Sequence, residues 1–386
     1  MARTPLLLAL GGGLAMAAGI GVGRFVYTPI LPPMVEALSL SKSQAGMIAS
    51  ANFLGYLAGA LLAALRLPGS RRAWLLGSLA ANALCLAAMG LTTALAVFLA
   101  LRLVAGMASA FTLIFASALV LERLAQQGRG ELSAVHFAGV GSGIAASAAL
   151  VALLLAGGAS WAGLWFASAA LALVAGIAVV VLVPPDTPRP ATAAAKPPPT
   201  GESRGFAALV VAYGLFGFGY IITATFIVDM VRGTAGLAPL EPYIWVVFGL
   251  SAAPSVALWT WIARRRGILV AYTWASLVEA AGVAVSALWL HAASVIVSAL
   301  FVGGTFMGLT ALGLVAAREG AGGDPRGRIA LMTAAFSFGQ ILGPTFAGYL
   351  YDRTGSLATP QLVAAGTLVL AAVLSTVADA RRRGRI

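Results

Sequence analysis

Long apolar stretches separated by short polar segments run along the whole chain. Each stretch is continuous and about 20 residues long, the length at which an α-helix crosses the hydrocarbon core of a bilayer. The residue-by-residue alternation of a membrane β-barrel is absent. The pattern predicts an all-α membrane protein with twelve transmembrane helices, near residues 6–34, 43–65, 73–93, 96–121, 133–156, 161–183, 206–230, 242–263, 268–290, 293–317, 328–351 and 358–379.

The pattern stops between the sixth and seventh predicted spans. Residues 184–205 are rich in proline and charged residues and offer little apolar surface to bury. Such a segment favours an extended, solvated linker. We therefore expect an N-terminal six-helix bundle at 1–183, a cytoplasmic proline-rich linker at 184–205 and a C-terminal six-helix bundle at 206–386.

A repeat supports this division. The segment Gly21–Met34 aligns without gaps with Gly217–Met230, a shift of 196 positions. The glycines at both ends of Gly21-Val22-Gly23 match, the terminal methionines match, and Arg24 aligns with Tyr220. The two predicted bundles therefore look like copies of one another.

The amino-acid composition indicates which solvent surrounds the protein. The 386 residues are 60% hydrophobic and 9% charged, whereas a soluble domain carries about 25% charged residues. The chain must be solvated largely by lipid. Its net charge of +12 does not indicate nucleic-acid binding, because the basic residues lie in short loops between spans. The single cysteine, Cys85, cannot form an internal disulfide.

The basic residues also predict an orientation. Nineteen of the 24 Lys and Arg residues lie in segments on the same side as the two termini. The opposite side holds Lys42, Arg232 and Arg353, and Arg24 and Arg102 fall inside spans. Because cytoplasmic loops are enriched in Lys and Arg, we expect both termini in the cytoplasm.

Two parallel six-helix halves are the architecture of major facilitator transporters, and several motifs resemble that superfamily. The segment Leu101–Ala110 resembles its fourth-span motif, with an Arg followed by Gly four residues later. Gly139–Ile144 resembles the glycine-rich fifth-span motif without its proline. Leu65–Arg72 resembles the loop motif after the second span, but Ala64-Leu65 replaces the usual acidic residue.

Four segments resemble more specifically the YbfB/YjiJ group of bacterial transporters: Gly21–Met34, Gly217–Phe226, Gly303–Gly308 and Gly339–Tyr349. The resemblance covers nearly the whole chain. It implies a major facilitator fold, a substrate site between the halves, a location in the bacterial inner membrane and a monomeric protein.

Arg24 is the first candidate site residue. A cation near the bilayer centre costs about 2.5–3.5 kcal/mol on insertion scales, and Arg cannot lose its proton to avoid that cost. At helical spacing Arg24 shares a face with Tyr27 and Thr28. The functional interpretation is a site for an anionic substrate. The alternative is a structural Arg paired with an acidic residue or with helix-end carbonyls.

Other polar residues of the spans extend this candidate substrate site. Tyr220 and Thr223 occupy the matching face of the seventh span, where Tyr220 could instead be an ordinary packed aromatic residue. Gln340 and the Asn52–Tyr56 pair could reach a central cavity or simply bridge helices. The substrate-binding candidates are therefore Arg24, Tyr27, Thr28, Asn52, Tyr220, Thr223 and Gln340.

Proton coupling or gating has four candidates. By the resemblance, Arg102 would act in coupling or in positioning cavity groups; it could instead extend to the outer surface. Glu279 could carry a proton or bond a neighbouring helix, and His136 could titrate or only pack. Asp229, at an outer span end, could gate or be interfacial.

These features predict a secondary active transporter for a small organic solute, working by alternating access with protons as the coupling ion. Drug or metabolite efflux by antiport is an alternative, and a membrane sensor without transport is an alternative of another class. We expect no enzymatic activity, because the chain has two histidines and neither paired carboxylates nor a metal-ligand spacing. The ATP-binding motif G-x-x-x-x-G-K-[ST] is absent too. No cofactor, metal or nucleic-acid partner is expected.

Overall fold

The computed structural model describes residues 4–65, 67–185, 205–319 and 326–383, and within these ranges the chain forms helices and no strands. Twelve helical segments of the described chain are long and apolar enough to cross a membrane, which confirms the predicted number. Most of the predicted linker and Arg66 lie outside the described residues. The helices are α1 (Pro5–Met16), η1 (Ala17–Val22), α2 (Tyr27–Leu38), α3 (Lys42–Ala63), α4 (Arg71–Met89), α5 (Leu95–Gln126), η2 (Gly130–Leu132), α6 (Ser133–Ala156), α7 (Trp161–Leu182), α8 (Phe206–Arg232), η3 (Ala238–Leu240), α9 (Glu241–Ala252), α10 (Ser255–Arg266), α11 (Ile268–Leu288), α12 (Ala292–Glu319), α13 (Arg326–Thr354) and α14 (Ala358–Arg382).

Serine side chains begin several of these helices. Ser41 accepts a hydrogen bond from the amide of Gln44, whose side chain bonds back to Ser41 as a capping box. Ser70 and Ser160 cap α4 and α7 by accepting from the amides of Ala73 and Gly163. These caps satisfy amide groups that have no partner inside the helix, which fixes where the spans begin.

Two of the twelve spans are interrupted, which the sequence pattern did not predict. The first consists of α1, the π-helical turn η1, a turn at residues 23–26 and then α2. The eighth consists of α9 and α10, which meet at Ala253 and Pro254. Glycine-rich sequence permits the first interruption, and proline, which has no amide proton, explains the second.

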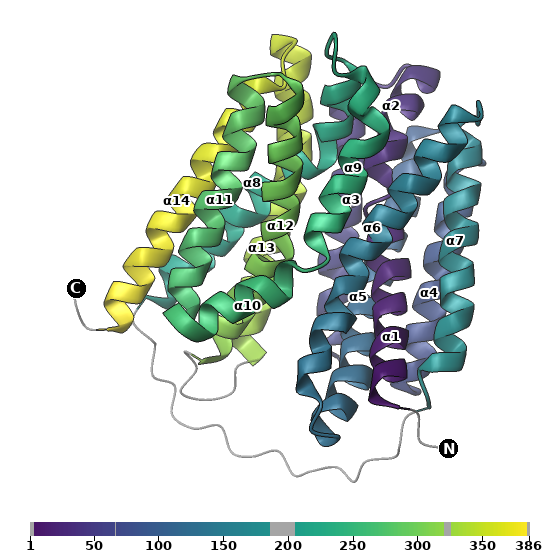
Figure 1. Ribbon diagram of the computed structural model, residues 1–386. Helices are drawn as coiled ribbons and strands as arrows, with labels where there is room; N and C mark the ends of the chain where they lie inside the picture. The colour runs from purple at the N-terminus through teal and green to yellow at the C-terminus, as the bar shows by residue number, and fades with distance from the viewer. Residues whose placement is uncertain (1–3, 66, 186–204, 320–325, 384–386) are drawn as a thin grey trace.

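The spans form two groups, α1–α7 and α8–α14 (Figure 1). The groups meet mainly through the helix pairs α3 with α13, α6 with α9, and α2 with α8. In Figure 1 they approach one another toward the end of the molecule where α2 finishes, here called the Leu38 end. They diverge toward the opposite end, called the Pro5 end, where α7 finishes and α8 begins.

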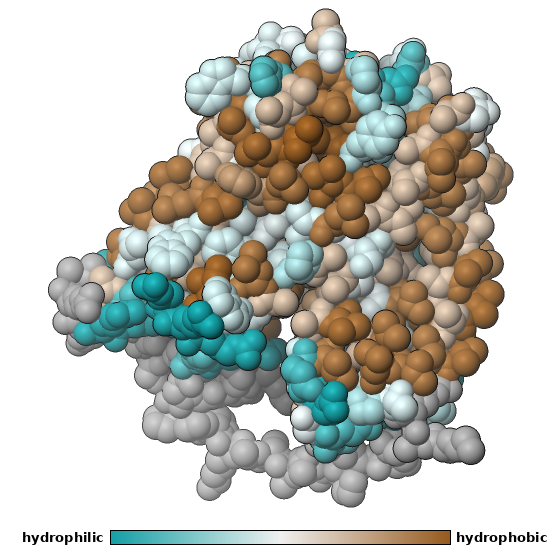
Figure 2. All heavy atoms as spheres, viewed as in Figure 1, coloured by the Kyte–Doolittle hydropathy of each residue, from teal (hydrophilic) through white to brown (hydrophobic). Residues whose placement is uncertain are grey.

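Among the described residues, the hydrogen bonds between the groups also lie away from the Pro5 end. Those that join two described residues all involve residues 24–50 of the first group, none of which lies near the Pro5 end. Figure 2 shows a notch between the two lobes at the Pro5 end, with hydrophilic residues gathered around it. Hydrophobic residues cover much of the sides, as expected for surfaces that face lipid.

The repeat seen in the sequence reappears as contacts between equivalent residues. Thr28 donates its hydroxyl proton to the carbonyl of Ala224 at 2.7 Å, and these residues are 196 positions apart. Arg232 pairs with Glu36, again 196 positions apart. Residues related by a two-fold axis touch their own equivalents only beside that axis. The first and seventh spans therefore meet at a pseudo-two-fold axis between the groups.

Candidate functional site

The interruption of the first span exposes backbone carbonyl groups in the interior of the bundle. In η1 the amide of Gly23 donates to Ala18, a spacing of five residues, and the amide of Phe25 donates to Ile20 at the same spacing. Among the described residues, no main-chain amide donates to the carbonyls of Gly23 and Arg24. Pro29 adds to this effect, because it has no amide proton for the carbonyl of Phe25. The carbonyls of Gly19, Gly23, Arg24 and Phe25 all accept hydrogen bonds from side chains.

Arg102 of α5 holds this break from inside the first group. Its guanidinium donates to the carbonyl of Gly23 at 3.3 Å and to that of Arg24 at 3.1 Å. Its side chain is 2% exposed and lies over the ring of Tyr27. The sequence resemblance allowed a role in proton coupling or in positioning cavity groups, and the geometry supports positioning.

Glycine explains why Arg102 can reach the first span. Gly106, one turn further along α5, packs against the backbone of Asn52, and a Cβ there would collide with the Asn52 carbonyl. The Asn52 side-chain amide donates to the carbonyl of Arg102 at 3.0 Å. Close contact between α3 and α5 thus fixes the base of the Arg102 side chain.

Asn82 and Ser109 hold the other side of the break. Both donate to the carbonyl of Gly19, at 2.9 and 2.6 Å, and Asn82 also donates to Ser109. The sequence analysis did not select these residues. An Asn or Ser in a span can bond many neighbours, so its role can be assigned only when its hydrogen-bond partner is known. Together with Arg102 they supply hydrogen-bond donors to the carbonyls at the break. These bonds stabilise the break, because buried carbonyls without partners are costly.

Arg24 projects from this turn into the region between the groups. Its Nη2 donates to the Oε1 of Gln340 on α13 at 2.8 Å. Its Cζ lies 4.5 Å from the ring centres of both Phe53 and Tyr56 on α3. The residue is 6% exposed, and its Nε has no hydrogen-bond partner.

Gln340 joins the two residues that the repeat aligns. While its oxygen accepts from Arg24, its amide nitrogen donates to the hydroxyl of Tyr220 on α8. The ring of Tyr220 stacks between Phe306, at 5.5 Å, and Phe336, at 5.9 Å. Arg24, Tyr220 and Gln340, far apart in the sequence, are therefore brought into one cluster, called here the Arg24 cluster.

The Arg24 cluster contains more donors than acceptors. The guanidinium offers several N–H groups and accepts nothing. The hydroxyls of Tyr220 and of Tyr56, whose ring lies beside Arg24, each have one further proton to donate. Among the described residues, Tyr56 makes no hydrogen bond through its hydroxyl, and no carboxylate lies within ion-pairing distance of Arg24 or Arg102. A carboxylate or phosphate would supply the missing acceptors and the missing negative charge.

The remaining candidate substrate residues lie nearby but point their polar groups elsewhere. Tyr27 donates to the carbonyl of Ala45 at 2.8 Å, and Thr28 donates to Ala224. Thr223 donates to the side chain of Gln361 at 2.5 Å. These bonds, like that of Asn52 to Arg102, connect helices rather than bind Arg24.

The candidate coupling residues are dispersed. Glu279 is fully buried between α11 and α12, where its Oε1 accepts from Thr305 at 3.1 Å and its Oε2 has no partner. His136 is buried against α5, with its Nε2 3.1 Å from the hydroxyl of Ser117. Neither hydrogen-bonds to the Arg24 cluster.

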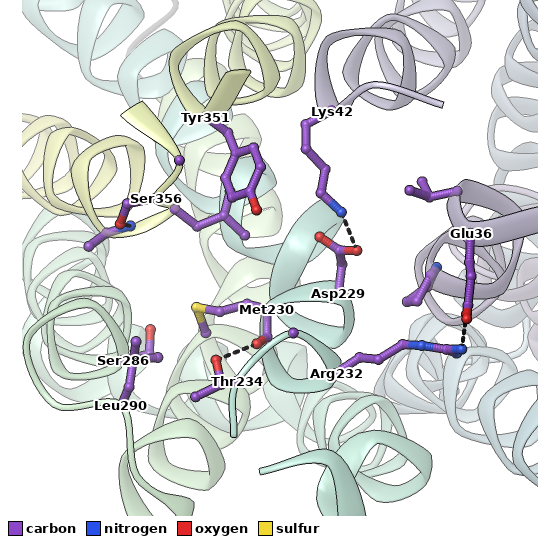
Figure 3. A pocket seen from close by; sticks show the side chains of 16 residues that line it. Glu36, Lys42, Asp229, Met230, Arg232, Thr234, Ser286, Leu290, Tyr351 and Ser356 are labelled. Atoms are coloured by element: carbon purple, nitrogen blue, oxygen red, sulfur yellow. Dashed lines mark hydrogen bonds and ion pairs between the residues drawn. The ribbon is translucent and has the colours of Figure 1, made fainter. Parts of the chain in front are cut away.

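Asp229 belongs to a charged network at the Leu38 end. It accepts from Lys42 of α3 at 2.6 Å, across the two groups. Arg232, three residues later, pairs with Glu36 and also with Glu241 at 3.1 Å. Figure 3 shows the side chains of the Lys42–Asp229 and Arg232–Glu36 pairs beside a cavity of about 400 Å³ that Met230, Leu290 and Tyr351 also line.

Asp352 of α13 also joins the two groups at the Leu38 end. Its carboxylate accepts from the backbone amides of Lys42 and Ser43 at 3.1 and 3.0 Å, so it caps the first turn of α3 from the opposite group. The sequence analysis placed Asp229 at an outer span end but did not select Lys42 or Asp352. These partners could not be foreseen, because Asp229 and Asp352 lie 187 and 310 positions from Lys42.

Known proteins resemble this chain in fold. The crystal structure of the nucleoside transporter NupG has a TM-score of 0.70 and 16% identity, covering 97% of this chain and 98% of NupG. A bacterial homolog of the human lysosomal transporter Spinster, in an inward-facing and occupied conformation, has a TM-score of 0.71 and 14% identity, covering 99% and 98% of the two chains. At these identities the likeness shows the fold. No curated protein matches the sequence.

One family profile covers most of the sequence. The family described as "Uncharacterised MFS-type transporter YbfB" matches residues 16–376, which include most of both groups of helices and the whole Arg24 cluster. The chain therefore belongs to the YbfB-type family of major facilitator transporters, and it is a multi-pass membrane transporter.

Proposed function

We propose that the protein is a secondary active transporter that moves a small organic anion by alternating access, with the Arg24 cluster as its substrate site. The observation that carries this proposal is a buried Arg24 without a carboxylate among the described residues, surrounded by spare hydrogen-bond donors at the contact between the two groups. An intramembrane cation is expensive, and a substrate that needs it gives a reason to keep it.

The charged loops support an orientation for this proposal. The Pro5 end carries most of the Lys and Arg residues, so we assign it to the cytoplasm of a bacterial inner membrane. The hydrogen bonds between the groups then lie in the middle and outer parts of the membrane, and the notch opens inward. Lys42–Asp229, Arg232–Glu36 and the Asp352 cap act as the outer gate in this scheme.

Protons are the proposed coupling ion. The chain carries no nucleotide-binding loop, so an ion or substrate gradient must supply the energy. Glu279, fully buried in a span and without a cation within ion-pairing distance among the described residues, is the proposed proton carrier. We propose a monomer, because one chain contains both groups of helices and the cluster between them.

A binding screen followed by a transport assay tests the function. Purified protein is first screened by thermal shift against acetate, benzoate, succinate, amino acids and common antimicrobials, since a ligand of the folded state raises the unfolding temperature. Any hit is then tested by counterflow in liposomes. Exchange of a labelled carboxylate supports the proposal. Hits confined to cationic or neutral compounds contradict the anion site, and binding without exchange under any gradient indicates a sensor.

A further inference from the structure

The second group of helices also holds the break in the first span. Trp245 of α9 donates its indole Nε1 proton to the carbonyl of Phe25 at 3.2 Å. Its side chain is 1% exposed, and its ring stacks on Phe248 with the ring centres 4.2 Å apart. This bond differs from those of Arg102, Asn82 and Ser109, because it joins the break to the opposite group.

The carbonyl of Phe25 is available because of Pro29. In a regular helix the amide four residues later would donate to this carbonyl, but residue 29 has no amide proton. Among the described residues, the one main-chain bond to the Phe25 carbonyl comes from the amide of Thr28, at 3.3 Å. Phe25 directly follows Arg24, so its carbonyl belongs to the turn that orients the guanidinium.

The helix that carries Trp245 is part of the contact between the groups. α9 packs on α6 of the first group, where Gly249 and Gly141 allow the two backbones to touch. Separation of the groups at the Leu38 end would move α9 away from α6 and from the first span. The Trp245–Phe25 bond would then break, while the bonds from Arg102 would remain, since α5 and the first span belong to the same group.

We propose that Trp245 is a positioning residue that couples closure of the Leu38 end to the geometry of the Arg24 turn. In the closed arrangement four side chains from both groups hold the break. In the open arrangement the turn keeps only the support of its own group and becomes more mobile. The effect on transport rests on the proposed function, whereas the effect on the turn and on closure does not.

A matched pair of variants tests the coupling. Trp245→Phe keeps an aromatic ring against Phe248 and removes only the N–H donor. Trp259→Phe makes the same change at a tryptophan that donates to Gly304 at 2.8 Å within the second group. Hydrogen–deuterium exchange of the full-length protein should rise about three- to tenfold at residues 20–28 in Trp245→Phe, the factor expected from one lost hydrogen bond. Hydrogen–deuterium exchange at these residues should be unchanged in Trp259→Phe.

Closure is measured with spin labels on the two groups. Thr93→Cys and Ala292→Cys place labels at exposed positions on the Leu38 side, in a Cys85→Ala background. Trp245→Phe should increase the fraction of long distances between the labels, and Trp259→Phe should not. If Trp245→Phe matches Trp259→Phe in both measurements, the proposal is overturned.

A rescue variant distinguishes loss of the hydrogen bond to the Phe25 carbonyl from a general structural defect in Trp245→Phe. Pro29→Ala restores an amide that can donate to the Phe25 carbonyl, so it should reduce the effect of Trp245→Phe on exchange at residues 20–28. An undiminished effect in the double variant would overturn the proposal as well. If the wild-type protein binds none of acetate, benzoate and succinate, the anion-transport function fails, while the exchange and distance results still decide the coupling.

Discussion

Replacement of Arg24 should weaken ligand binding without lowering the folding stability of the protein. In Arg24→Gln the side chain keeps a polar end but loses its charge and its fork of donors. Arg24 occupies a buried position 2.8 Å from Gln340, with two aromatic rings at 4.5 Å and no carboxylate among the described residues to balance it. Removing one partner of a buried, charged contact with a ligand costs about 2–5 kcal/mol, which weakens binding by roughly 30-fold to several thousand-fold.

The same substitution should not destabilise the protein. Burial of the unpaired cation costs several kcal/mol, and the compensating contacts with Phe53 and Tyr56 contribute only about 0.5–2 kcal/mol each. The Gln340 bond contributes about 1.5–3 kcal/mol. These terms nearly cancel, so the unfolding temperature of Arg24→Gln in the absence of ligand should equal or exceed that of the wild type. Function rather than stability would then account for the arginine.

The assay measures both quantities on the same samples. Thermal unfolding of the purified protein is followed with increasing carboxylate concentration, for Arg24→Gln, Arg24→Lys and the exposed control Arg265→Gln. Arg24→Lys keeps the charge without the planar fork and should bind with intermediate affinity. An unchanged dissociation constant in Arg24→Gln would refute the anion site. A loss of stability in the ligand-free variant, with binding retained, would identify Arg24 as structural.

Three further predictions concern the neighbouring features. Gln340→Glu places a carboxylate beside Arg24 and should abolish anion binding while raising the unfolding temperature; retained affinity would mean that the substrate does not need the free charge. Asp229→Asn removes the ion pair with Lys42 and should shift spin-label distances at the Leu38 end toward the open form, with Glu122→Gln as the control away from that end. Glu279→Gln keeps the shape that bonds Thr305 but cannot exchange a proton, so the pH dependence of transport should flatten in liposomes; a wild-type pH profile would remove Glu279 from the coupling mechanism.

Much of the candidate site could be predicted one residue at a time. Arg24 was identifiable because a permanent charge in an apolar run needs an explanation, and Tyr220 because the repeat places it opposite Arg24. The same reasoning selected Thr223 and Tyr27, whose hydroxyls bond Gln361 and Ala45. A polar residue in a span reveals that it needs a partner but not which partner it has.

Arg102 illustrates the same limit. Its charge within a span indicated a role, and the glycine four residues later indicated close helix packing. That it holds the carbonyls of Gly23 and Arg24 depends on the break in the first span. The break itself needs donors from α4, α5 and α9, so no local propensity of residues 17–26 could have predicted it.

The sequence by itself determined the twelve spans and the repeat, and it made Arg24 a marked position. It could do so because the bilayer imposes one requirement on every lipid-facing residue, and a continuous apolar run satisfies that requirement locally. Only the tertiary structure decided that Gln340 connects Arg24 to Tyr220 and that Trp245 reaches the Arg24 turn. These contacts join residues 120 to 316 positions apart, and side-chain hydrogen bonds of that kind follow from how the helices pack rather than from the pattern along any one of them.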